Sequence, residues 1–152
     1  MKSCSDILAE ARARAPGQPY AGAVTPQEAY ALVQADPKVK LIDVRTNAER
    51  AWVGRVAIPE AQHGAVEWVG WPGGAPNPDF VQQLSRIAGK DDVLLFLCRS
   101  GVRSRHAAKL ATEHGYANSF DVLEGFEGDK DSAGHRKSVA GWCKAGLPWV
   151  GA

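Results

Sequence analysis

The sequence predicts an α/β fold, in which a small parallel β-sheet carries helices on both faces. Strand-like and helix-like segments alternate along the chain, which is the order typical of parallel sheets. The segment VLLFL, residues 93–97, is a continuous apolar run of strand length, as expected for a strand that is covered on both faces. The chain has 152 residues, and a domain commonly contains about 100–200 residues, so we expect one domain.

The N-terminal segment is expected to precede that domain. Residues 5–15 have the apolar spacing of a short helix with Ser5 as its N-cap, and the sequence PGQP that follows ends it. We therefore assign residues 1–21 to an N-terminal extension and residues 22–152 to a single domain.

One helix and one strand are expected at the start of the domain. Thr25 can cap a helix and form a capping box with Glu28, and Pro37 ends this helix at Asp36. The apolar residues that follow, 39–44, predict a short strand.

Two helices and a last strand are expected in the second half. Asn77 begins a helix that Gly89 caps at its C-terminus, and a second helix covers residues 103–114. Residues 119–123 form the last predicted strand. The segment 63–78, rich in Trp, Pro and Gly, is too irregular to assign.

Charge and hydropathy exclude several classes of function. Lys and Arg number 18 against 17 Asp and Glu, for a net charge of +1, which leaves no electrostatic footprint for a nucleic-acid or membrane-surface binder. No apolar run approaches the ~18 residues of a transmembrane helix, and the N-terminus lacks the apolar core of a signal peptide. We therefore expect a cytoplasmic protein that binds neither nucleic acid nor membrane.

The cysteine pattern argues against a structural or metal-binding use. Cys4, Cys98 and Cys143 are odd in number and far apart, so they form no disulfide framework and no zinc site. A candidate calcium loop over residues 129–140 has Ala140 where a bidentate Glu is required. We expect no metal and no cofactor. In a reducing compartment, a cysteine with a function is a reactive thiol; we take Cys98 as that thiol and the other two as bystanders.

The segment CRSGVRS, residues 98–104, leads from the end of a buried strand into a helix. Ligands of open α/β sheets bind at this end of the strands. A loop that turns there into a helix directs backbone N–H groups inward, and the helix dipole adds to this anion cradle. Gly101 permits the tight turn.

A thiol in this cradle should carry thiolate character at neutral pH, since Arg99, Arg103 and Arg105 add positive charge nearby. The alternative is that Cys98 is a small buried hydrophobe and that Ser100 only caps the next helix. The loop by itself leaves both interpretations open.

Five segments, in order, resemble the rhodanese family (the sulfurtransferase homology domain) over roughly residues 22–150. They are LIDVR with Glu49 (41–49), a weaker match at Gly54, Ile58 and Ala61, CRSGVRS with Ala107 and Ala108 (98–108), VLEG (122–125), and GW with GLPW (141–149). Arg55 and Glu60 depart from the family, which has His and Gly there. The resemblance implies a single-domain, rhodanese-like α/β fold.

The resemblance also implies a reaction. Cys98 would attack the outer sulfur of an anionic donor such as thiosulfate, and the resulting persulfide would pass its sulfur to a thiophilic acceptor, cyanide or a thiol. Asp43, Arg45 and Glu49 would support the loop, with Arg45 pairing with Glu49. The implied substrate-binding residues are Arg99, Ser100, Gly101, Val102, Arg103 and Ser104.

Two other functions remain as alternatives. One is a persulfide carrier that delivers sulfur to a protein partner. The other is a phosphatase or arsenate reductase of the same fold, but these use a longer loop, with the arginine one position further from the cysteine than Arg103 is from Cys98. The segments 62–78 and 127–139 are longer than a minimal domain requires. They either form walls beside the site or are packing decoration.

Overall fold

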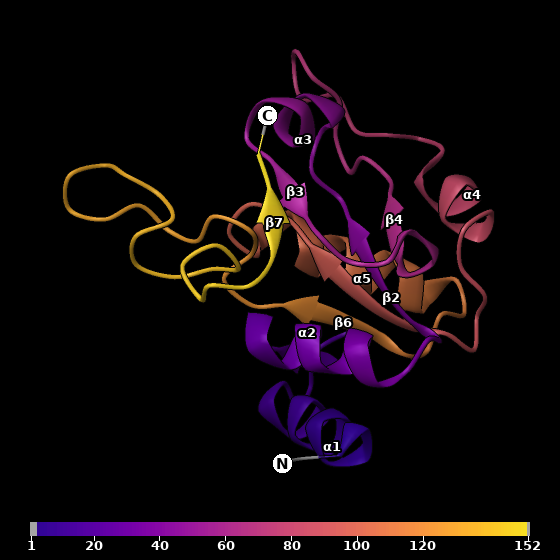
Figure 1. Cartoon of the computed structure of the whole chain (residues 1–152). Helices are drawn as coiled ribbons and strands as arrows, with labels where there is room; N and C mark the ends of the chain where they lie inside the picture. The colour runs from indigo at the N-terminus through magenta and orange to yellow at the C-terminus, as the bar shows by residue number, and fades with distance from the viewer. Residues whose placement is uncertain (1–2, 152) are drawn as a thin grey trace.

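A five-stranded parallel sheet forms the centre of the computed structural model, which describes residues 3–151 (Figure 1). Its strand order is β1-β6-β5-β2-β4, and every neighbouring pair runs parallel. The α/β prediction is therefore confirmed. In that order the strands are Gly22–Val24, Ser119–Val122, Val93–Leu97, Val39–Asp43 and His63–Ala65.

Helices cover both faces of the sheet. Helices α1 (Cys4–Arg14) and α2 (Pro26–Ala35) lie together on one side, as Figure 1 shows. Helices α4 (Phe80–Ser85) and α5 (Val102–Glu113) pack against the other face. The described residues include no helix of the length and apolarity needed to cross a membrane.

The shorter elements lie around the sheet. Helix α3 (Asn47–Trp52) follows the carboxyl end of β2, and a 3-10 helix (Glu60–Gln62) precedes β4. The strands β3 (Arg55–Val56) and β7 (Trp149–Val150) pair antiparallel, so the end of the chain returns to the residues after α3.

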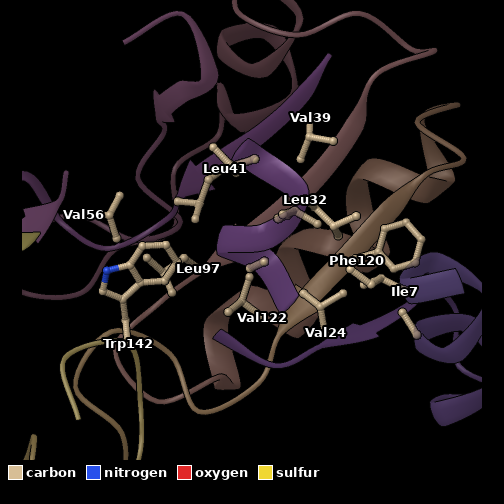
Figure 2. Close-up of a cluster of buried hydrophobic side chains, with 14 of the residues drawn as sticks. Ile7, Val24, Leu32, Val39, Leu41, Val56, Leu97, Phe120, Val122 and Trp142 are labelled. Carbon is tan, nitrogen blue, oxygen red and sulfur yellow. The ribbon is translucent and has the colours of Figure 1, made fainter. Parts of the chain in front are cut away.

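The core on the α1 and α2 side contains the largest buried side chain, that of Trp142 (Figure 2). Leu32, Leu41 and Phe120 pack in the same cluster, and α1 adds Ile7. The indole Nε1–H of Trp142 donates to the carbonyl of Pro148 at 2.8 Å. The C-terminal segment is thereby fastened to this core, because a buried indole N–H requires a partner.

The core on the other face determines where the Cys98 side chain points. Side chains of a strand alternate between the faces. Leu95 and Leu97 of β5 belong to the α2-side core, whereas Leu94, Phe96 and Cys98 belong to the core beneath α4 and α5. The Cys98 thiol therefore faces α5.

The four helix predictions are confirmed as elements, with three corrections at their ends. The N-cap of α1 is Ser3, not Ser5, because Ser3 and Asp6 form a reciprocal capping box. Helix α4 begins at Phe80, not at Asn77, because Asn77 accepts the N–H of Asp79 at 3.0 Å in a turn ahead of the helix. It ends at Ser85, not at Gly89, because the backbone N–H of Gly89 bonds instead to the carboxylate of Asp92 at 2.8 Å.

Helix α2 has the predicted Thr25 cap and capping box, and α5 begins one residue before the predicted start. The predicted strands 39–44, 93–97 and 119–123 match β2, β5 and β6 to within one residue.

Candidate active site

The Cys98 loop follows β5 at the carboxyl edge of the sheet, where its backbone is tightly held. The N–H of Phe126 donates to the Cys98 carbonyl at 2.8 Å, and the N–H groups of Glu127 and Gly128 donate to the Arg99 carbonyl at 3.0 and 3.1 Å. Gly125 is required beneath this contact, since a Cβ there would lie 2.5 Å from the Arg99 carbonyl carbon. The loop is therefore fixed in position before any substrate arrives.

Cys98 is buried, with 1% of its surface exposed, and its sulfur has two polar neighbours. The backbone N–H of Gly101 donates to Sγ at 3.0 Å, and the Ser104 hydroxyl oxygen lies 3.3 Å from Sγ. Gly101 has the positive φ of 103° that this turn requires. Helix α5 starts at the next residue, so the positive end of its dipole lies beside the sulfur.

Arg103 is held by Glu49 across the mouth of the loop. Its two terminal nitrogens donate to the two carboxylate oxygens at 2.7 and 2.9 Å, a bidentate pair. Burial opposes ionisation of Glu49, but the hydrogen bonds from Arg103 and Thr46 outweigh it and lower the pKa of Glu49 to about 2. This pair fixes α3 against the start of α5.

The prediction that Arg45 pairs with Glu49 is wrong, because Arg45 pairs with Asp43. Both side chains are 0% exposed, and Arg45 donates from Nη2 to Asp43 at 2.7 Å and to the Gly54 carbonyl at 2.8 Å. The guanidinium also lies 4.3 Å from the ring centre of Phe126, whose N–H holds the Cys98 carbonyl. Asp43 and Arg45 thus support the loop from below.

Arg99 lies between two grooves that meet at the loop. The apolar groove, about 500 Å³, is lined by Trp52 of α3, Trp71, Arg99 and Arg103, among others. The basic groove, about 590 Å³, shares Arg99. Its other charged or titratable lining residues are Lys130, His135, Arg136 and Lys137, with the carboxylates Glu49 and Glu127.

Each long segment therefore forms a wall next to the loop. Residues 69–74 line the apolar groove and residues 127–137 the basic one. The second segment, orange in Figure 1, extends away from the sheet beside β7. Of the remaining predicted loop residues, Ser100 is half-buried and Val102 is exposed at the start of α5.

A sequence model of the rhodanese-like domain matches residues 25–132, most of the chain and the whole of this loop. The chain belongs to the rhodanese-like family. The crystal structure of Rv0390 from M. tuberculosis is similar, with a TM-score of 0.80 and 39% identity, over 88% of this chain and 99% of that one.

Two curated relatives of this rhodanese-like chain have comparable similarity. The thiosulfate sulfurtransferase GlpE of Haemophilus influenzae is 30% identical over 82% of this chain and 90% of its own length. An uncharacterized protein of Rickettsia conorii is 33% identical over 80% of this chain and 91% of its own length. The chain thus spans nearly all of both relatives.

A cavity larger than either groove, about 760 Å³, lies on another side of α3, away from the loop. It is lined by Arg50, Arg55 and His63, among others, with no Cys, Ser or Thr among its lining residues. Burial lowers the pKa of His63, which favours the neutral imidazole. Residues 3–151 contain no group of three or more His, Cys, Asp or Glu side chains that could hold a metal.

One residue of the site was missed by sequence reasoning. Asp121 of β6 is 1% exposed, and its carboxylate bonds to the hydroxyl of Ser104, the same hydroxyl that lies beside the Cys98 sulfur. Burial raises the pKa of Asp121 to about 6. A charged residue between Phe120 and Val122 in the fully buried strand SFDV was the available signal, since buried carboxylates are rare without a partner.

Proposed function

We propose that the protein is a sulfurtransferase that carries a sulfane sulfur as a Cys98 persulfide. The observation that carries the proposal is the Cys98 sulfur at the start of α5, where it accepts the N–H of Gly101. Membership of the rhodanese-like family supports it, as does the name of the Haemophilus relative.

The reaction has two displacement steps. The Cys98 thiolate attacks the outer sulfur of thiosulfate, a new S–S bond forms, and the sulfur–sulfur bond of the donor breaks so that sulfite leaves with the electron pair. Cyanide or a thiol then attacks the outer sulfur of the persulfide, and Cys98 leaves as a thiolate. Backbone N–H groups of residues 99–104 stabilise the charge on the persulfide. The sequence of steps needs no cofactor.

The basic groove supports an anionic donor. Arg99 is exposed, and within residues 3–151 no carboxylate forms an ion pair with it. Together with Lys130, Arg136 and Lys137 it concentrates positive charge at the mouth of the loop, and such a field attracts small anions. A cytoplasmic location remains our proposal, based on the three unpaired thiols.

The apolar groove favours a second candidate function, the persulfide carrier. Trp52 and Trp71 are 70% and 62% exposed and pack edge to face, with ring centres 6.1 Å apart. Exposed tryptophans are typical of protein-binding surfaces. A protein acceptor that covers this groove would reach the loop at Arg99. Phosphatase or arsenate reductase activity is less well supported, because Glu49 neutralises Arg103.

The test is the formation of thiocyanate from thiosulfate and cyanide. We expect Cys98→Ser to lower the rate by about a thousandfold or more, whereas Cys143→Ser, which removes a thiol whose pKa burial raises to about 11, keeps it. Equal rates for the parent and Cys98→Ser would reject the proposal. If the parent takes up one sulfur on Cys98 by intact mass but turns over slowly, the carrier is favoured.

A further inference from the structure

We propose that Asp121 takes up the thiol proton of Cys98 through the hydroxyl of Ser104. Under this proposal, the three residues act as one unit that decides when the sulfur is a nucleophile. The inference deepens the proposed function, because it concerns how the same sulfur is activated, but it can be tested without any sulfur donor.

The three groups form one continuous hydrogen-bonded chain. Ser104 Oγ lies 3.3 Å from the Cys98 sulfur and is hydrogen-bonded to Asp121 Oδ1. Ser104 is in the first turn of α5, and Asp121 lies on β6 opposite Phe96 of β5, so both adjoin the end of the strand that carries Cys98. All three side chains are shielded from solvent.

The chain has two proton arrangements because a serine hydroxyl carries a single hydrogen. When Asp121 is a carboxylate, Ser104 donates to it, and the thiol keeps its proton and donates to the Ser104 oxygen. When Asp121 is a carboxylic acid, it donates to Ser104, and the hydroxyl hydrogen of Ser104 turns toward a thiolate.

The two arrangements contain the same number of protons. In passing from the first to the second, the S–H bond of Cys98 breaks while an O–H bond forms on Ser104. The former O–H bond of Ser104 breaks as an O–H bond forms on Asp121. One negative charge moves from the carboxylate to the sulfur, and no oxidant or other reactant takes part.

The sulfur has more contacts that suit a negative charge than Asp121 has. It has the Gly101 N–H and the start of α5, and Arg103 lies nearby, although Glu49 pairs with that guanidinium. Within residues 3–151, Ser104 supplies the one side-chain hydrogen bond to Asp121.

The other groups that face Asp121 do not neutralise it by contact. Arg105 of α5 acts from a distance and donates its Nε–H to the Gly101 carbonyl instead. Tyr20, ahead of β1, is the other titratable neighbour. The register partners on β1 and β5, Ala23 and Phe96, carry no charge. Burial raises the pKa of Asp121 to about 6, so it holds a proton more readily than an ordinary aspartate.

The proton stays within the site during turnover. While the sulfur is engaged in the persulfide, Asp121 holds the proton. When the acceptor removes the outer sulfur, Cys98 leaves as a thiolate, which Ser104 stabilises by donating its hydrogen. The proton can then return from Asp121 to Cys98 in the resting state. Proton exchange with solvent is unnecessary at any step.

The experiment is the rate of Cys98 alkylation by iodoacetamide as a function of pH, in a Cys4→Ser, Cys143→Ser parent in which Cys98 is the one remaining thiol. The parent should become reactive in two steps, because the thiol and Asp121 titrate as a coupled pair.

Two variants should move this profile in opposite directions. Asp121→Asn, nearly isosteric, should give a single step below the parent's second step by at least about one pH unit, because a negative charge beside the thiol is gone. Ser104→Ala should lose the first step and shift the remaining one to higher pH, because the thiolate loses a donor.

The control is Ser119→Ala, which removes another buried hydroxyl of β6, bonded to the Tyr116 carbonyl. It should leave the pH profile unchanged. Profiles of both Asp121→Asn and Ser104→Ala that superimpose on the parent, or that shift in the same direction, would overturn the proposal. Alkylation requires no sulfur donor, so failure of the thiocyanate assay would leave this result interpretable.

Discussion

Two buried aspartates lie beside the strand that leads to Cys98, and their carboxylates have opposite kinds of partner. Asp43 ends β2 opposite Leu97, and Asp121 lies on β6 opposite Phe96, so they flank β5 on its two sides. Asp43 is bonded to the guanidinium of Arg45, whereas the side-chain partner of Asp121 is the Ser104 hydroxyl. Both are essentially without solvent contact.

The difference follows from the face of the sheet on which each carboxylate lies. Asp43 and Arg45 pack with Phe126 in the α2-side core, and Asp121 points toward α5. A buried carboxylate with a matched cation is locked as an ion and serves as scaffolding. One with a hydroxyl as its partner can change its protonation, because no fixed charge holds it ionised. The presence of a counter-charge thus distinguishes Asp43, which supports the loop, from Asp121, which we propose takes up a proton.

The largest expected effect comes from breaking the matched pair. Asp43→Asn leaves the Arg45 guanidinium buried without a counter-charge, and we expect it to lower the free energy of unfolding by about 3–5 kcal/mol. Urea unfolding at neutral pH measures this change. Asp43→Asn combined with Arg45→Met, which removes both charges, should recover most of the loss. A single variant within about 1 kcal/mol of the parent would contradict the assignment of Asp43 as scaffolding.

The unmatched carboxylate should show the opposite behaviour. The pKa of Asp121 rises from 3.8 in the unfolded chain to about 6 in the fold, so its ionisation costs stability as pH rises through this range. Relative to the parent, Asp121→Asn should therefore gain about 2 kcal/mol of unfolding free energy between pH 4 and pH 7.

Urea unfolding of the parent and Asp121→Asn at the two pH values tests this expectation. Asp92→Asn is the control, because burial opposes the ionisation of Asp92 but the hydrogen bonds from Lys40 and the Gly89 N–H together outweigh it and lower the pKa of Asp92. Its difference from the parent should change with pH in the opposite direction. A pH-independent difference for Asp121→Asn would mean that Asp121 is ionised in the fold as readily as in the unfolded chain.

The half-buried pair of Glu49 and Arg103 should give the smallest effect. The pKa of Glu49 falls from 4.5 to about 2 in the fold, so the stability it contributes is present above pH 4.5 and lost as pH falls through 2. Because both side chains keep about a fifth of their exposure, we expect Glu49→Gln to cost about 1–2 kcal/mol at pH 7. The difference in unfolding free energy between the parent and Glu49→Gln should fall toward zero when both are unfolded at progressively lower pH. A difference that does not change with pH would mean that Glu49 stabilises the fold by packing.

The sequence correctly predicted the helices and strands whose residues show a local pattern. The apolar run of β5 and the Thr25 capping box are local properties, and both were predicted correctly. The two-residue strands β3 and β7 were not predicted, because such elements are too short to show a period. They exist through contacts between distant residues, such as the Ala57 N–H bonded to the Pro148 carbonyl.

The sequence predicted the cysteine loop of the site but not which charged side chains of the site pair with one another. The cysteine loop follows from a contiguous motif. The resemblance led us to expect that Arg45 and Glu49 pair, but α3 turns Glu49 toward Arg103, which is 54 residues away. Asp121 acquires its role from Ser104 on the helix packed above it. Partners of this kind are decided by tertiary packing.

The fixed backbone of Arg99 has a consequence for how fast its charge can move between the two grooves. Its carbonyl accepts two N–H groups from the segment behind it, while its guanidinium is exposed where both grooves meet. Arg99 can therefore pass from one groove to the other by side-chain rotation alone, which takes picoseconds to nanoseconds. This exchange is about a thousandfold or more faster than the microsecond-to-millisecond motions of loops that open.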